Sequence, residues 1–457
     1  MNTPRMVATA LAIGLFSLSS SAAVQTEELP KYVNIAAKTK EQRTKIANAG
    51  VSIEAIRSDG IWGFARPNAL ARVKKAGFKV LSTHSFETGR GGHQGGGMSA
   101  KDFPSEDSRF HNYNELITEL DNLAGKHSDI AKVEQLGKTT EGRKILALHI
   151  NTTPIELQSG QSTKPGAVFI GNHHAREHLS IEIPLMLAQH LLAKRNDPAI
   201  QKLLETRDIW ILPMLNPDGS EYDIATGDYQ MWRKNRAKNH DGTYGVDLNR
   251  NYSYFWNHGG ASNDPSDETY MGTKPFSENE TQAVKAFVEA HKNFKILLSF
   301  HTFSELILYP WGHTYDKINK PRDLQVYETM AKQMSKWNGY TPQQSSDLYI
   351  ASGDTTDWTY GQQGIFSFTF ELSPRSMWFG GGFYPGEGVI DKVFNDNLKP
   401  CLYMIDLADD PYRVLAKPLM SYGSSYQAPE KFISKIQNDG QNNGLFADVL
   451  FEKPAKF

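Results

Sequence analysis

The order of apolar and polar positions predicts two units along this chain, a small one followed by a larger one. In the small unit, short strand-like stretches alternate with two helical stretches, and each helical stretch stops at a glycine. The elements expected here are strands at Lys31–Ala37, within Val51–Ala65 and at Phe78–Leu81, and helices at Glu41–Ala49 and Pro67–Lys75. This pattern predicts a compact α/β unit.

A glycine-rich stretch, Gly89–Gly97, separates the small unit from the rest of the chain. A segment of this composition cannot pack a core and predicts a flexible linker. A compact unit, a linker and a larger domain are the layout of a protease precursor, although an ordinary accessory domain has the same layout. Arg90 lies within the linker and offers a cleavage site to a trypsin-like processing protease.

The larger unit runs from about Phe103 to about Tyr412, and strands and helices alternate through it. Such alternation is typical of an α/β sheet covered by helices on both faces, in which sites collect at the carboxyl ends of strands. The clearest expected elements are strands at Ala167–Ile170, Asp208–Leu215, Lys295–Phe300 and Phe366–Leu372, helices at Ile181–Arg195 (with Ser180 as N-cap) and Glu278–His291, and a turn at Asn216–Gly219.

The first 23 residues have the pattern of a cleaved signal peptide. Arg5 supplies a positive charge, Met6–Leu18 is apolar, and Ser19–Ala23 is a run of small residues suited to cleavage. The apolar run is shorter than the roughly 20 residues that span a bilayer. We therefore expect a soluble protein that is secreted or periplasmic and does not bind a membrane.

The formal net charge of -2 gives no indication of a nucleic-acid partner or of a charged membrane surface. The single cysteine, Cys401, excludes an intrachain disulfide and cannot form a thiolate metal site alone. Any metal site in this chain must therefore use histidines and carboxylates.

Three such residues follow two of the expected strands. His174 and Glu177 come after Ala167–Ile170, and their spacing places an imidazole and a carboxylate about one helical turn apart on one face. His301 directly follows Lys295–Phe300 and supplies a third ligand. Each signal is weak alone, but two histidines and one glutamate leave the fourth position of a zinc ion to water, as in catalytic zinc sites.

The strand Phe366–Leu372 carries a further candidate. Its three phenylalanines share one face, whereas Ser367, Thr369 and Glu371 share the other. A carboxylate near the end of an apolar strand is costly to bury without a purpose or a partner. Glu371 is therefore a candidate general base that deprotonates a water molecule at the metal, although an edge-strand carboxylate or a salt bridge is the simpler alternative.

Two polar clusters, Trp232–Arg236 and Val246–Asn251, contain further arginines. Guanidinium groups bind carboxylates through two hydrogen bonds and stabilise oxyanions. Taken singly these arginines are more typical of a protein surface. In combination with an open zinc site they indicate a substrate that carries a terminal carboxylate.

Together these motifs resemble the zinc metallocarboxypeptidases of the carboxypeptidase A type. The resemblance covers about Phe103 to Tyr412, and several stretches look closest to bacterial members of the carboxypeptidase T type. The motifs, in the order that is also seen in the family, are His174–Glu177, Trp232–Lys234, Asp247–Asn251, Ser299–His301, Leu348–Gly353 and Phe368–Leu372. The family's fold is a mixed, mainly parallel α/β sheet with helices on both faces.

The resemblance implies a role for each catalytic candidate. His174, Glu177 and His301 would hold one Zn²⁺ per chain. Glu371 would be the base and afterwards the shuttle that carries the proton to the leaving amine. Arg233 would share the oxyanion with the metal.

It also implies how a substrate would bind. Asn249, Arg250 and Tyr349 would hold the terminal carboxylate of a peptide or protein, and Arg176 would lie in the neighbouring subsite. The segment around Thr356 would line the pocket for the C-terminal side chain. Thr356 matches neither the aliphatic residue of members that prefer apolar C-termini nor the aspartate of members that prefer basic ones.

Asp354 lies two residues before Thr356, as in the carboxypeptidase T type. In an extended segment, positions two apart face the same way, so Asp354 could reach the pocket that Thr356 lines. This predicts release of both apolar and basic C-terminal residues. The alternative is that Asp354 only caps a turn.

The resemblance gives the domains their expected roles. Residues 1–23 would be the signal peptide, 24–97 an inhibitory pro-domain with its linker, 98–412 the catalytic domain, and 413–457 a polar tail without an assigned role. An activating protease is an expected partner, and a monomer is the expected state.

Three alternatives stay open at this point. His174, Glu177 and His178 also fit the pattern H-x-x-E-H, in which both histidines bind the metal and the glutamate is the base, but this leaves His301 and Glu371 without a role. The same zinc site could act as a peptidase or amidase on peptidoglycan stem peptides. A non-catalytic binding protein on the same scaffold is the third alternative.

Overall fold

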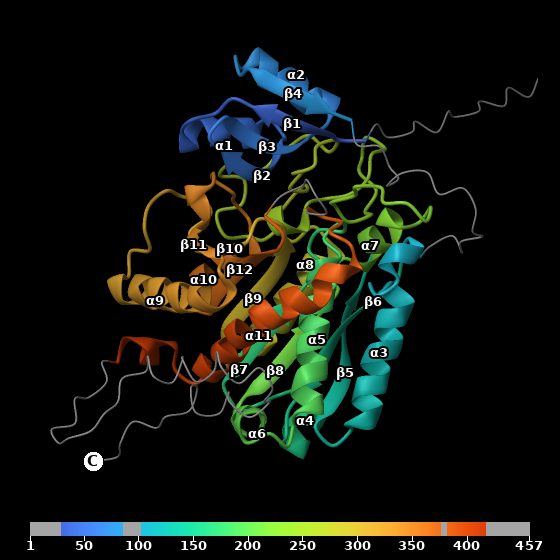
Figure 1. The fold of residues 1–457 in the computed structure, drawn as a ribbon, viewed down its shortest axis with the longest axis vertical. Coiled ribbons are helices and arrows are strands. Elements are labelled where there is room, and N and C mark those ends of the chain that lie inside the picture. Colours follow the sequence, from blue (N-terminus) through green and yellow to red (C-terminus); the bar gives the residue numbers. More distant parts are fainter. Residues whose placement is uncertain (1–28, 86–101, 376–381, 417–457) are drawn as a thin grey trace, which may run out of the picture.

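The computed structural model describes residues 29–85, 102–375 and 382–416. The expected signal peptide, the glycine-rich linker and most of the tail lie outside these residues. Figure 1 shows a small sheet with two helices seated at one end of a larger sheet that helices cover. Along the chain, the small unit precedes the larger one.

The small unit is a four-stranded antiparallel sheet in the order β2-β3-β1-β4, with two helices packed on it. Apolar side chains of the strands and of both helices form a core of its own. The elements are β1 (Lys31–Ile35), α1 (Lys40–Asn48), β2 (Ser52–Arg57), β3 (Gly60–Ala65), α2 (Pro67–Lys75) and β4 (Val80–His84). All the elements predicted from the pattern are present.

The larger unit is built on an eight-stranded sheet in the order β11-β10-β12-β9-β7-β8-β6-β5. The central strands β12, β9, β7 and β8 pair in parallel, whereas β5, β6 and β10 add antiparallel pairs, so the sheet is mixed as expected. The strands are β5 (Ala131–Lys138), β6 (Lys144–Ile150), β7 (Gly166–Ile170), β8 (Asp208–Leu212), β9 (Phe294–Thr302), β10 (Leu306–Tyr309), β11 (Thr341–Gln344) and β12 (Phe366–Leu372).

Helices cover both faces of this sheet, because the side chains of β7, β8 and β9 alternate between two apolar cores. Ala167 and Phe169 of β7 join the core with α3, α5, α9 and α11, whereas Val168 and Ile170 join the core with α8 and Trp358 of α10. The helices are α3 (Tyr113–Lys126), α4 (Pro154–Ser159), α5 (Leu179–Ala193), α6 (Pro198–Thr206), α7 (Pro217–Asp223), α8 (Asn279–Ala290), α9 (Pro321–Asn338), α10 (Thr355–Gln363) and α11 (Ile390–Leu407).

Three local expectations were wrong. The turn expected at Asn216–Gly219 is the start of α7, where the Asn216 side chain caps the helix by accepting from the Gly219 amide. Ser180 lies inside α5 and donates to the Glu177 carbonyl instead of capping the helix. Strand β9 continues to Thr302, so His301 belongs to the strand.

Ion pairs join the small unit to the larger one at the carboxyl ends of the central strands. Arg66 pairs with Glu268 at 3.1 Å, and Arg72 pairs with Asp264 at 2.8 Å and also with Asp267. Strand β2, at the edge of the small sheet, faces the larger unit (Figure 1). The small unit is therefore placed where a site on the larger sheet is expected.

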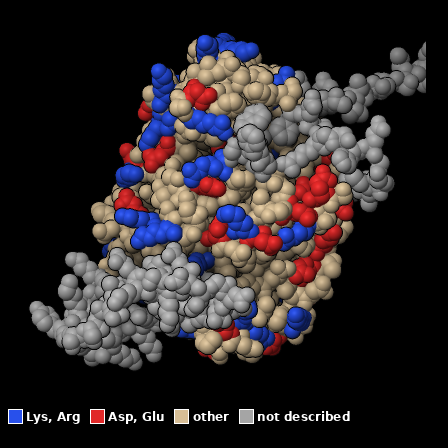
Figure 2. Space-filling view, viewed as in Figure 1, with Lys and Arg blue, Asp and Glu red and all other residues tan. Residues whose placement is uncertain are grey.

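Across most of the face shown in Figure 2, basic and acidic side chains are interspersed, in keeping with the small net charge. Among the described residues, no helix combines the length and the apolar character that a membrane crossing requires.

Candidate active site

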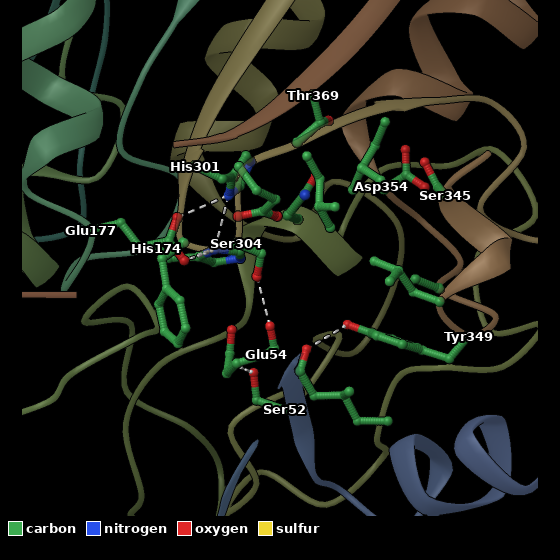
Figure 3. A pocket seen from close by; sticks show the side chains of 18 of the residues that line it. Ser52, Glu54, His174, Glu177, His301, Ser304, Ser345, Tyr349, Asp354 and Thr369 are labelled. Atoms are coloured by element: carbon green, nitrogen blue, oxygen red, sulfur yellow. Dashed lines mark hydrogen bonds and ion pairs between the residues drawn. The ribbon is translucent and has the colours of Figure 1, made fainter. Parts of the chain in front are cut away.

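A pocket lies where β7, β9 and β12 end. Because these strands are parallel, their carboxyl ends share one edge of the sheet, and the register pairs Glu371 of β12 with His301 of β9. His174 and Glu177 lie in the chain that leaves β7. All four residues line the same pocket, shown in Figure 3.

The three predicted metal ligands converge in this pocket. One ligand atom from each of His174, Glu177 and His301 lies within 4.8 Å of the other two. The two Nδ1 atoms are 3.1 Å apart, and the Glu177 carboxylate oxygens lie 2.7 Å from that of His174 and 3.0 Å from that of His301. All three side chains are buried. Two imidazole nitrogens and a carboxylate are the donors that zinc prefers, so the residues fit this metal.

Asp247 supports this group and was not predicted to have a role. Its Oδ1 lies 3.0 Å from Nε2 of His174, the ring nitrogen that faces away from the other ligands. Carboxylates in this position orient the imidazole of a metal ligand and raise its basicity. In the sequence, Asp247 belongs to the motif Asp247–Asn251, but its residue type alone does not indicate that it contacts a metal ligand.

The same carboxylate holds Arg233. The guanidinium lies 3.0 Å from Oδ2 of Asp247 and 3.8 Å from Glu177, and it lines the pocket. Burial works to raise the pKa of Asp247, but Arg233 and His174 outweigh it and hold this pKa well below its usual range. Arg233 is thus fixed in orientation, as an oxyanion donor must be.

Glu371 lies at the pocket wall with some exposure to solvent. The phenylalanines that precede it in β12 point into the opposite core, so the predicted alternation is confirmed. Burial first, and then the charges of Glu177 and Glu54, raise the pKa of Glu371 well above its usual range. A divalent cation among the neighbouring ligands would oppose this rise.

Asn249, Arg250 and Tyr349 meet in the same pocket. The Arg250 guanidinium lies 3.3 Å from the Tyr349 hydroxyl and is held by the carbonyls of Asn249 at 2.8 Å and Gly260 at 2.9 Å. An amide, a guanidinium and a phenol gathered in one place can together hold a carboxylate.

Asp354 and Thr356 also line the pocket, but the segment is helical and not extended as assumed. Asp354 is the N-cap of α10, and its Oδ1 accepts from the Asp357 amide at 2.7 Å and from the Thr356 hydroxyl at 2.8 Å. Among the described residues, its Oδ2 makes no hydrogen bond. Burial, together with the charge of Asp357, raises the pKa of Asp354 to about 7. One oxygen of this carboxylate therefore caps the helix, and the residue also lines the pocket.

Two further residues of the motif lie outside the pocket lining while the small unit is docked. Arg176 is fully buried and does not line the pocket; its guanidinium pairs with Glu268 at 2.8 Å and with Glu54 at 3.2 Å. His178 is directed away from the ligand group, and its Nε2 lies 2.9 Å from Asp223. This orientation disagrees with the H-x-x-E-H alternative.

The small unit reaches into the pocket through Ser52, Ile53 and Glu54 of β2. The Ser304 hydroxyl donates to the Glu54 carbonyl at 2.8 Å, and the Tyr349 hydroxyl lies 3.5 Å from the Ile53 carbonyl. Figure 3 shows Ser52 and Glu54 entering from the small unit, opposite His301. No pattern in the sequence identified these residues, because their role depends on docking between two units.

Comparisons with known proteins agree with this arrangement. A family described as zinc carboxypeptidase matches residues 116–400. A zinc carboxypeptidase of Saccharothrix mutabilis subsp. capreolus is 34% identical over 87% of this chain and 94% of its own length. A carboxypeptidase B of Astacus astacus is 32% identical over 58% of this chain and 86% of its own length. The solved structure of carboxypeptidase A from Helicoverpa armigera shares the fold, with a TM-score of 0.66 over 85% of this chain and 98% of that one at 23% identity.

The geometry of the ligand group predicts tight binding of one zinc ion per chain. We expect His301→Ala to lose the metal, because two ligands remain of the three. His127→Ala, which changes a histidine at the end of α3, is the matched control and should keep the metal. Metal content after dialysis against a weak chelator measures both, and full zinc content in His301→Ala would contradict the ligand assignment.

Proposed function

The chain belongs to the zinc carboxypeptidase family, and we propose that it releases both apolar and basic residues, one at a time, from the C-termini of peptides. It is accordingly a zinc-dependent metallocarboxypeptidase, and peptide C-termini are the substrates of this family. The observation that carries the proposal is that one pocket holds both the ligand group and a set of groups suited to a carboxylate.

The positions of the side chains support the proposed catalytic roles. Zinc, when held by His174, Glu177 and His301, supplies Lewis acidity that polarises a carbonyl and lowers the pKa of a water molecule. Glu371 takes a proton from the attacking water and passes it to the leaving amine. Arg233, held by its carboxylate partner, donates to the oxygen that becomes negatively charged as water attacks.

The carboxylate-binding groups explain why cleavage would be confined to the last peptide bond. Asn249, Arg250 and Tyr349 line the same pocket as Glu371 and the ligand group, which supports their role in holding a terminal carboxylate. An internal segment of a protein has no charge to offer there and would leave the Arg250 guanidinium without a carboxylate partner. The proposed substrate is therefore a free C-terminus.

The proposed dual specificity depends on the free oxygen of Asp354. Its Oδ2 can accept from a guanidinium or an ammonium group, whereas Thr356 presents a methyl group that an apolar side chain tolerates. The neighbouring Asp357 cannot do the same, because its carboxylate accepts from the amides of Gly312 and His313 and from the His313 ring.

The small unit is proposed to act as an inhibitory pro-domain. Its strand β2 fills part of the pocket, Glu54 pairs with Arg176, and α1 holds the loop that carries Tyr349. From α1, the Arg43 guanidinium donates to the Asp347 carbonyl of the loop at 2.9 Å. The Ile350 amide of the loop donates to the Thr44 hydroxyl of α1 at 2.9 Å. A substrate cannot enter while these contacts persist.

The setting of the activity is also part of the proposal. The signal-peptide pattern of residues 1–23 supports export, to the periplasm or beyond the cell, followed by cleavage in the linker by another protease. A release assay with a panel of C-terminal residues, run with and without a chelator and compared with muropeptides, tests the substrate class. Release from muropeptides alone would contradict the proposal.

The role of Glu371 predicts a loss of turnover without a loss of metal. Glu371→Gln removes the proton acceptor and should lower kcat by roughly 10²–10⁴-fold. Glu289→Gln, which changes a half-buried glutamate in α8 away from the pocket, is the control. Stopped assays at saturating substrate measure kcat, and a rate near that of the parent protein in Glu371→Gln would refute the mechanism.

The pocket carboxylate predicts a change in specificity. Asp354→Asn keeps a good helix cap but removes the charge, whereas Asp354→Ala removes both. We expect both variants to lose roughly 10- to 100-fold in kcat/KM for Lys and Arg substrates and little for Phe or Leu. Equal losses on both substrate classes, or a loss only in the alanine variant, would show that Asp354 acts as a cap alone.

The raised pKa of Asp354 adds a pH dependence to this preference. Because the pKa is about 7, the carboxylate is mostly protonated below that pH and charged above it. For basic substrates, kcat/KM should therefore rise relative to that for apolar substrates as pH increases from about 6 to 8. Parallel pH profiles for the two substrate classes would count against the charge of Asp354.

The docked small unit predicts latency. Protein that begins at Val24 should be much less active than protein cleaved between about Thr88 and Pro104. Arg72→Ala removes two ion pairs to the larger unit and should raise the residual activity of the uncleaved protein. Equal activity of the cleaved and uncleaved forms would remove the inhibitory role.

A further inference from the structure

A chain of buried hydrogen bonds links the ligand His301 to Asn249 through three side chains that have no role so far. Ser299, His173 and Thr355 are each at most 1% exposed. The successive contacts are His301 Nε2 to Ser299 Oγ at 3.1 Å, Ser299 Oγ to His173 Nδ1 at 3.2 Å, His173 Nε2 to Thr355 Oγ1 at 2.8 Å, and Thr355 Oγ1 to Asn249 Oδ1 at 2.9 Å.

The direction of these hydrogen bonds is set at the Asn249 end. The backbone amide of Thr355 donates to Oδ1 of Asn249 at 2.9 Å, which fixes the amide oxygen, and not the nitrogen, toward Thr355. Since this oxygen carries no hydrogen, the Thr355 hydroxyl donates to it. The Thr355 oxygen is then free to accept from Nε2–H of His173. The Tyr252 hydroxyl, 3.0 Å from the same Nε2, is a second contact there.

The donor and acceptor roles set at Asn249 also determine which nitrogen of His301 carries the proton. A neutral imidazole has one N–H, so the Nδ1 of His173 accepts from the Ser299 hydroxyl. The Ser299 oxygen in turn accepts from Nε2–H of His301. This leaves the lone pair on Nδ1 of His301 pointing at His174 and Glu177. The opposite direction would place a proton on that Nδ1, and a protonated nitrogen cannot bind a metal.

Both histidine ligands are thereby connected to Asn249. The backbone N–H of Asn249 donates to Oδ1 of Asp247 at 3.0 Å, and this Asp247 oxygen also lies 3.0 Å from Nε2 of His174. One route thus runs through a single carboxylate, and the other runs through the three buried side chains. Asn249 is the group proposed above to hold the substrate's carboxylate.

We propose that His173, with Ser299 and Thr355, is a positioning unit that keeps His301 in its metal-binding tautomer and sets the position of Asn249. The proposal rests on the proposed function only for the role of Asn249. None of the three side chains lines the pocket or touches substrate. They act through the residues that do.

Zinc affinity of the full chain tests the first half of the proposal. Ser299→Ala and Thr355→Val each remove a hydroxyl at nearly constant volume, and His173→Leu removes the whole link. We expect each to weaken zinc binding by roughly 10–100-fold, as the loss of an outer partner of a metal ligand does. Competition with a chromophoric chelator measures the affinity, and the visible spectrum of the Co²⁺-substituted protein should change in parallel.

Two matched variants separate this role from packing. Thr355→Ser keeps the hydroxyl and should bind zinc like the parent protein. Thr359→Val changes a buried threonine one turn further along α10. The Thr359 hydroxyl contacts the Thr355 carbonyl and the Ser367 hydroxyl, and it takes no part in the hydrogen bonds between His301 and Asn249. This variant should also keep the parent affinity. Circular dichroism tests whether each variant folds. If His173→Leu does not fold, Ser299→Ala and Thr355→Val still test the proposal.

The second half is tested on processed protein at saturating zinc. Thr355→Val should raise KM for peptides several-fold while kcat falls less, because Asn249 loses a fixed partner. Parent-like zinc affinity in all three variants, or an equal loss in Thr359→Val, would overturn the proposal. Zinc affinity is measured without substrate, so a failure of the proposed peptidase activity would appear separately, as a parent protein that binds zinc but releases no C-terminal residue.

Discussion

Parallel hydrogen bonding holds the ends of β7, β9 and β12 side by side, and the composition of the pocket depends on this pairing. The register places Glu371 beside His301 and brings the chain that leaves β7 over the same edge, where it supplies the other two ligands. Both faces of these strands are largely buried, so a slip of one residue would turn His301 into an apolar core and remove the phenylalanines from that core. The large apolar cores therefore secure the position of a few polar groups.

Much of this arrangement could be predicted from local pattern. The alternation in Phe366–Leu372 gave both the strand and the face of Glu371, and α2 begins at Pro67 and ends at Lys75 as expected. The errors at the ends of helices and strands have a common cause. Where an element ends depends on hydrogen bonds that form only in the folded protein. Asn216, for example, reads as a turn residue but caps α7 because Pro217 continues into a helix.

The partners of the site residues could not be predicted in this way. Asp247 reaches His174 across 73 positions, and His173 reaches Thr355 across 182. With the small unit docked, Arg176 lies between the rings of Phe64 and Phe383 and pairs with Glu54, contacts that no local pattern indicated. These residues become neighbours only when the chain folds. A periodic pattern in the sequence indicates only on which face of a helix or strand a side chain lies.

The two oxygens of Asp354 have a consequence for how such a pocket can diversify. One oxygen caps α10 while the residue lines the pocket, and asparagine caps a helix about as well as aspartate does. A single nucleotide change between the two amino acids would therefore alter the charge of the pocket while leaving the start of the helix intact. The charge of the pocket can thus change at this position without a compensating change elsewhere in the fold.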